Sequence, residues 1–167
     1  MHRMVLTLLL SAVLAACSAP STALPSGSAV VVEGCPITLA EAHAAVPALI
    51  RGPDIGQPSK NVTEDCMFFS ADTDSQGHPA AVGILVFDAR GAGVHMWDSA
   101  RRDPSFPNAT TVPGLGDDAF VTGAPRPTDL FAVQGQIALH IADLLPGGVT
   151  VEQFAQLARA AFARLQP

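Results

Sequence analysis

The feature that most constrains this chain is a short apolar run that ends at a cysteine near the amino terminus. His2 and Arg3 precede the run, which occupies residues 4–16, and small residues stand directly before Cys17. This layout is typical of a secretory signal. The apolar core of the run is about a dozen residues long, whereas a membrane-spanning helix needs about 20. We therefore expect a signal peptide at residues 1–16 and a folded domain that lies after it.

The end of this run, Leu14-Ala15-Ala16-Cys17, resembles the lipobox of bacterial lipoproteins. The resemblance implies a thioether-linked lipid on Cys17, cleavage before it and, in many bacteria, acylation of the new amino terminus. A plain signal peptide with an incidental Cys17 is the alternative. Because two or more acyl chains anchor a protein stably, we expect it at the extracytoplasmic face of the cell membrane.

Composition changes sharply after the cysteine. Residues 17–29 are rich in Pro, Ser and Ala and predict a flexible tether, and residues 30–167 are long enough for one globular domain. The chain has 9 basic and 15 acidic residues, a net charge of −6, and cleavage removes only Arg3 from this count. Because the chain has no stripe of basic residues that could neutralise phosphates, we do not expect it to bind nucleic acid. The membrane contact should therefore come from the lipid on Cys17.

Two cysteines remain once Cys17 carries the lipid. An exported domain with two thiols most often pairs them, so we expect a disulfide between Cys35 and Cys66. The bridge would close a loop of about 30 residues and contribute about 3–4 kcal/mol. Two free or metal-binding thiols are the alternative, although no Cys-x-x-Cys or Cys/His spacing supports zinc.

Helix signals occur at three places. Thr38 and Glu41 form a capping box that predicts a helix over residues 38–46, which Pro47 should end or kink. Residues 92–102 are expected to be helical, with Val94, Trp97 and Ala100 on one face. A second capping box, at residues 150–153, precedes an apolar stripe at helical spacing and predicts a helix to the end of the domain.

Apolar runs between turn residues predict the strands. The expected hairpins are 64–72 with 80–88 and 129–133 with 136–143. A further strand is expected within residues 112–121, and residues 51–61 are interpreted as a loop. Short turns between neighbouring strands favour an α+β fold, with helices packed on an antiparallel sheet in a single domain.

Three segments and the closing helix together resemble a known family. The segments are Gly34-Cys35-Pro36-Ile37-Thr38-Leu39-Ala40-Glu41, Asp65-Cys66-Met67-Phe68 and Val112-Pro113-Gly114-Leu115-Gly116-Asp117-Asp118-Ala119. They are similar to actinobacterial lipoproteins catalogued as domain of unknown function 3558, over roughly residues 30–165. The resemblance implies an α+β fold and a place in the cell envelope. It implies no activity and supplies no catalytic residue.

The chain shows no motif for a nucleophile elbow, a zinc protease or a phosphate loop. His43 and His95 lie in expected helices, and His140 in an apolar strand, where it should alternate to the solvent side. His78 lies in a turn beside Asp72 and Asp74, interpreted as a solvated hairpin tip rather than a weak metal site. We therefore expect no metal, no cofactor and no catalytic residue.

Two further features admit a structural and a functional interpretation. Asp117 and Asp118 follow a glycine turn and are interpreted as turn residues, although with His140 they could serve a cell-wall hydrolase. Trp97 is interpreted as a core residue, with a ligand or partner anchor as the alternative. We expect a non-catalytic binding or accessory domain that meets an envelope protein or ligand. A carrier of an apolar ligand is the first alternative, and the hydrolase is the second.

Overall fold

The computed structural model describes residues 34–57, 62–74, 76–90, 92–103, 109–123 and 125–165. The helices are α1 (Leu39–Ala45), α2 (Ala92–Arg102) and α3 (Val151–Leu165). The strands are β1 (Leu49–Ile55), β2 (Glu64–Thr73), β3 (Pro79–Asp88), β4 (Thr110–Thr111), β5 (Asp118–Thr122), β6 (Asp129–Gln134) and β7 (Ile137–Asp143). They form one antiparallel sheet in the order β1-β2-β3-β7-β6-β5-β4. The predicted α+β fold, an antiparallel sheet with helices, is confirmed.

The predicted signal peptide, Cys17 and the tether at residues 17–29 lie outside the described residues. Of His95, only the helical backbone is described. None of the described helices has the length and apolar character needed to cross a membrane.

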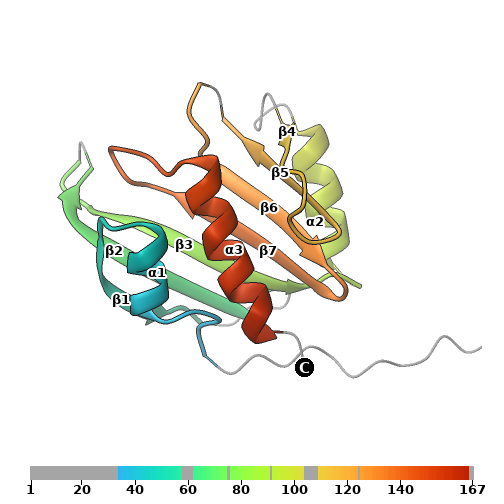
Figure 1. Cartoon of the computed structure of the whole chain (residues 1–167), viewed down its shortest axis with the longest axis horizontal. Helices are drawn as coiled ribbons and strands as arrows, with labels where there is room; N and C mark the ends of the chain where they lie inside the picture. Colours follow the sequence, from blue (N-terminus) through green and yellow to red (C-terminus); the bar gives the residue numbers. More distant parts are fainter. Residues whose placement is uncertain are drawn as a thin grey trace, which may run out of the picture.

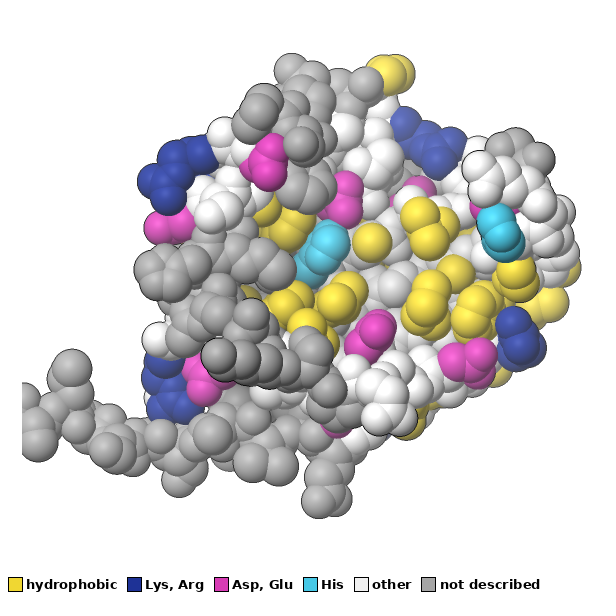
Figure 2. Space-filling model, turned by 180° about the vertical axis from the view of Figure 1, so that it is seen from behind, with side chains coloured by type: hydrophobic (Ala, Val, Ile, Leu, Met, Phe, Trp, Pro, Cys, Tyr) yellow, Lys and Arg dark blue, Asp and Glu magenta, His cyan; other side chains and the backbone are white. Residues whose placement is uncertain are grey.

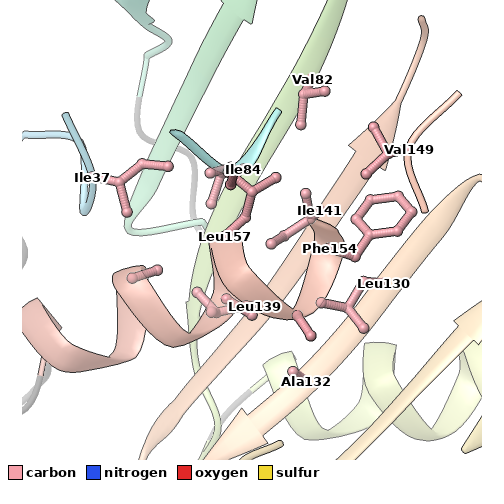
Figure 3. Close-up of a cluster of buried hydrophobic side chains, with 14 of the residues drawn as sticks. Ile37, Val82, Ile84, Leu130, Ala132, Leu139, Ile141, Val149, Phe154 and Leu157 are labelled. Carbon is pink, nitrogen blue, oxygen red and sulfur yellow. The ribbon is translucent and has the colours of Figure 1, made fainter. Parts of the chain in front are cut away.

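The sheet has a front face, covered by α1 and α3, and a rear face, of which α2 covers one end (Figure 1). Alternate strand residues point to the front, where aliphatic side chains pack under α3 (Figure 3). Leu139 and Ile141 of β7 and Leu157 of α3 are at most 1% exposed. The front face therefore holds the main hydrophobic core.

Both predicted capping boxes are present. In the first, Thr38 Oγ1 accepts a hydrogen bond from the Glu41 amide, and the Glu41 carboxylate accepts one from the Thr38 amide at 2.7 Å. In the second, the amide of Thr150 donates to Gln153 Oε1 at 2.9 Å, and Thr150 Oγ1 accepts from the Gln153 amide at 3.2 Å. These bonds satisfy amides that the first turn leaves without intrahelical partners, which places α1 and α3 where the sequence predicts them.

The interpretation of residues 51–61 as a loop is wrong for its first part, because β1 continues to Ile55 and pairs with β2. Gly52 and Pro53 suggested a break, but an edge strand tolerates proline, which lacks only a hydrogen bond on its open side. Gly52 has φ +122°, and a Cβ there would lie 2.6 Å from the carbonyl oxygen of Met67. The glycine therefore permits the close approach of β1 to β2.

Candidate functional site

Cys35 and Cys66 are neighbours, but they are free thiols in this structure and their sulfur atoms are not at bonding distance. Cys66 is fully buried on β2, while Cys35 is partly exposed. A hydrogen bond between the two thiols lowers the pKa of Cys35 and raises that of Cys66, and burial also raises the pKa of Cys66. The fold thus brings together the two cysteines for which the sequence predicts a disulfide, without a bond between them in this structure.

Asp117, Asp118 and His140 have separate partners. Asp117 Oδ2 accepts a hydrogen bond from the Gly135 amide at 2.6 Å, which ties the glycine turn to the β6–β7 hairpin. Asp118 pairs with Arg101 of α2 at 2.9 Å. Both aspartates are therefore engaged in structural contacts, and the three groups do not combine into one acid–base cluster.

His78 lies at the tip of the β2–β3 hairpin, as the sequence indicated. The Asp74 carboxylate accepts hydrogen bonds from the backbone amides of Gln76 and His78, both at 2.8 Å. These bonds, led by that of the His78 amide, lower the pKa of Asp74, whose side chain is 39% exposed. In the described part of the chain, no group of three or more His, Cys, Asp or Glu side chains could hold a metal ion.

His140 instead pairs with Asp129 on the rear face. His140 Nε2 lies 2.8 Å from Asp129 Oδ1, and the side chains are 19% and 15% exposed. Burial would raise the pKa of Asp129, but hydrogen bonds from His140, Thr128 and Thr122 outweigh it and lower that pKa. An ionised Asp129 can only accept, so His140 Nε2 donates the hydrogen of this bond. Within the described residues, Nδ1 has no hydrogen-bond partner.

A row of aromatic rings continues from His140 toward α2. The imidazole stacks on Phe131 with ring centres 4.4 Å apart and planes 3° from parallel. Phe131 stacks on Phe120 at 5.0 Å, and Trp97 of α2 meets Phe120 edge-on at 5.5 Å. Trp97 Nε1 is buried and has no hydrogen-bond partner among the described residues. The prediction of Trp97 as a core residue is confirmed by its packing under α2.

Small residues meet at the middle of the rear face. Gly83 on β3 lies opposite Met67 on β2 and Ala142 on β7. Ala142 in turn lies opposite Asp129 on β6. A Cβ added to Gly83 would meet no atom within 4 Å, although Gly83 itself is buried. The space above Gly83, which we call the Gly83 recess, is therefore sunk below the surrounding side chains.

Larger side chains stand around the Gly83 recess. Leu85 pairs with His140 across β3 and β7, and both close one end of it. At the other end, Ala81 lies between Phe69 of β2 and Leu144, whose amide donates to the Ala81 carbonyl at 2.8 Å. Leu144 is 59% exposed. The recess thus has an apolar floor, apolar walls and one polar corner at His140 and Asp129.

The rear face around the recess is apolar with a charged rim. Figure 2 shows hydrophobic side chains gathered over the middle of this face, with a histidine and acidic groups among them and basic groups farther out. At the β1 edge, the Arg51 guanidinium lies 4.3 Å from the centre of the Phe69 ring. Apolar surface that remains in contact with solvent inside a polar rim is typical of a binding site.

A second hollow lies between α1 and β1. Its volume is about 390 Å³, and it is lined by Leu39, Ala40, His43, Leu49 and Ile50. His43 Nδ1 donates to the Leu49 carbonyl at 2.8 Å and so ties the helix to the edge strand. Among the described lining residues, the one polar side chain is that of His43, whose Nδ1 serves this structural bond.

Sequence reasoning missed Asp129 and Gly83 as site residues. The alternation of Leu139, His140 and Ile141 predicted that His140 faces away from the core, and this is confirmed. The partner of His140 depends on the pairing of β6 with β7, which only the observed register reveals. A glycine in the interior of the apolar β3 run was the available signal for the recess, because such a glycine often marks a close approach of a ligand or backbone.

No protein-family model, no curated protein and no solved structure matches this chain.

Proposed function

We propose that this protein is a lipid-anchored lipoprotein of the bacterial cell envelope that works as a non-catalytic binding domain, with the Gly83 recess on the rear face as its binding site. The open, apolar space above Gly83 is the observation that carries the binding role. The apolar run that ends in Leu14-Ala15-Ala16-Cys17 supports the lipid anchor and the location in the cell envelope. The separate structural partners of Asp117 and Asp118 speak against the alternative of a cell-wall hydrolase.

We assign the chain to the actinobacterial lipoprotein family catalogued as domain of unknown function 3558. The support is the resemblance of the three quoted segments, and two of them have structural roles consistent with it. Thr38 and Glu41 cap α1, and Asp117 joins the glycine turn to the β6–β7 hairpin.

Lipidation is tested with Cys17→Ser in a bacterial host that processes lipoproteins. We expect the wild-type protein to take up labelled palmitate and to sediment with membranes. The variant should lose the label and either leave the membrane or persist as an unprocessed precursor. A variant that is still cleaved at residue 16 and still bound to the membrane would refute the anchor.

A disulfide between Cys35 and Cys66 belongs to the same proposal. The fold holds the two thiols within hydrogen-bonding reach, and an oxidising extracytoplasmic compartment favours the bond. Alkylation of the membrane-extracted protein should add no label before reduction and two labels after it, as read by intact mass. Two labels before reduction would show that the thiols stay free.

Binding is tested by native mass spectrometry of the protein released from its own membrane. We expect a bound mass that is lost in Gly83→Val, because the new side chain fills the recess. Gly147→Val is the matched control, since a Cβ there also meets open space but lies in the loop between β7 and α3. A bound mass that both variants retain would place binding elsewhere.

A further inference from the structure

We propose that Cys35 and Cys66 form a redox-active pair, which exchanges its disulfide with a dithiol of another exported protein. The inference rests on the disulfide proposed above and goes beyond it, because a purely structural disulfide does not react in the folded protein. It does not depend on the Gly83 recess.

The two cysteines differ in exposure. Cys66 lies on β2 with none of its surface exposed, whereas Cys35 precedes α1 outside any helix or strand and is partly exposed. An attacking thiolate must approach one sulfur atom of the disulfide directly. The fold therefore directs the attack to Cys35 and makes Cys66 the sulfur that leaves.

The reduced form of the pair fits the folded domain. Both thiols are free in this structure, and that of Cys66 donates a hydrogen bond to Cys35. This bond is the main cause that lowers the pKa of Cys35, and the Ile37 amide adds to it against the effect of burial. A lower pKa makes Cys35 a better leaving group in a mixed disulfide. Stabilisation of the reduced form makes the oxidised pair a stronger oxidant.

A buried carboxyl group stands beside the pair. Glu64 is 5% exposed and lies two residues before Cys66, on the same side of β2. Its Oε1 accepts a hydrogen bond from the amide of Gly34 at 3.2 Å, and Gly34 directly precedes Cys35. The hydrogen bond to Cys35 and burial raise the pKa of Cys66, so this sulfur needs a proton as it leaves. Glu64 is placed to relay that proton from solvent.

The exchange has two steps. A thiolate of the partner attacks the sulfur of Cys35, a mixed disulfide forms, and Cys66 leaves and takes a proton through Glu64. The second thiolate of the partner then attacks the partner's sulfur in the mixed disulfide and releases Cys35 as a thiolate, which takes a proton from solvent. The partner loses two electrons and two protons and gains a disulfide, while the pair is reduced to two thiols.

The test uses the mature lipoprotein in lipid nanodiscs, in which the proposed lipid occupies the thiol of Cys17. The probe is a peptide with two cysteines separated by two residues, in about tenfold excess under native conditions. We expect the pair to open and one peptide disulfide to form per protein, read by intact mass after acid quenching and alkylation. The quenched intermediate should carry the peptide on Cys35 and not on Cys66.

Three variants separate this exchange from other ways to open the bond. Glu64→Gln keeps an oxygen for the Gly34 amide but cannot relay a proton, so it should slow peptide oxidation at least tenfold. Asp65→Asn is the matched control, because it removes the same charge on the opposite side of β2, and it should change the rate less than about threefold. Leu139→Ala destabilises the core and should leave the rate unchanged. A bond that opens only by global unfolding would react more than tenfold faster in Leu139→Ala.

A pair that stays closed in excess peptide, or a rate that rises more than tenfold in Leu139→Ala, would overturn the inference and leave a structural disulfide. Equal rates for the wild type and Glu64→Gln would overturn the role of Glu64. If Glu64→Gln does not fold, the wild type and Leu139→Ala still decide the matter. Free thiols before the reaction would remove the proposed disulfide and this inference with it, whereas the lipid anchor and the binding role have their own tests.

Discussion

The two faces of the sheet are made by the same strands, yet they differ in kind. On β7, Leu139 and Ile141 point to the front and are sealed under α3, whereas His140 and Ala142 point to the rear and remain partly exposed. The buried polar side chains of the front face, Glu64 and Asp143, stand at strand ends, whereas the rear face holds a histidine that is hydrogen-bonded to Asp129 beside open space. Strand alternation thus separates a sealed face, which stabilises the fold, from a face that remains partly exposed.

The strongest test of this difference is the same Leu→Ala substitution on each face of the sheet. Leu139 on β7 and Leu85 on the neighbouring β3 lie on opposite faces. We expect Leu139→Ala to lower the free energy of unfolding by about 3 kcal/mol, because it leaves a cavity in a sealed core. Leu85→Ala should cost about 1 kcal/mol, because its side chain is already partly in water. Urea denaturation followed by circular dichroism measures both.

Equal losses for the two variants would show that the rear face is packed as tightly as the front. That result would remove the structural distinction on which the binding proposal depends.

The second prediction concerns a polar group buried on the front side. Asp143 ends β7, and its carboxylate accepts from the amides of Leu145 at 2.8 Å and Val149 at 2.9 Å, which fixes the loop into α3. Asp143→Asn leaves one of these amides facing an NH₂ group, so we expect a loss of about 2 kcal/mol. Asp54→Asn on the exposed edge strand is the control and should change stability by less than about 0.5 kcal/mol. A loss in the control as large as that in Asp143→Asn would point to net charge as the cause.

The sequence predicts what depends on local pattern. Capping boxes located α1 and α3, and apolar runs located β2, β3, β6 and β7. The sequence did not reveal β1, because its residues carry no alternation and its place depends on Gly52 fitting against β2. It also did not reveal the His140–Asp129 pair, which exists only because β6 and β7 meet in one register. Contacts within a segment can be predicted from its own residues, whereas contacts between segments become visible only in the three-dimensional structure.

The third prediction compares two acidic groups, one on each face. Burial raises the pKa of Asp143. On the rear, burial acts against Asp129 too, but the hydrogen bonds led by His140 lower its pKa. The stability that Asp129 contributes is therefore present above its unfolded pKa of about 3.9 and is lost as the pH falls through its folded pKa. The pH dependence is opposite for Asp143, whose pKa is raised on folding. Its contribution to stability is fully present below the unfolded pKa of about 3.9 and is lost as the pH rises through its folded pKa.

Carboxyl carbon shifts followed by NMR over a pH titration check both directions. Asp129→Asn should flatten the fall in stability in acid without moving the titration of Asp143. If Asp129 titrates at or above its ordinary range, the hydrogen bond with His140 is absent in solution.

The smallest effect is expected where α2 covers the rear face. The Arg101 guanidinium pairs with Asp118 at 2.9 Å and lies 4.8 Å from the centre of the Trp97 ring. Exposed ion pairs and cation–π contacts contribute little, so Arg101→Met should lower stability by about 0.5 kcal/mol. Trp97 is the only tryptophan of the chain, so intrinsic fluorescence reports on this end of the rear face. We expect the emission of Arg101→Met to shift while its far-ultraviolet circular dichroism stays unchanged, because α2 adjusts and the front core does not. A loss above about 2 kcal/mol would mean that the contact of α2 with the sheet is part of the main core, and the two faces would then not differ as described.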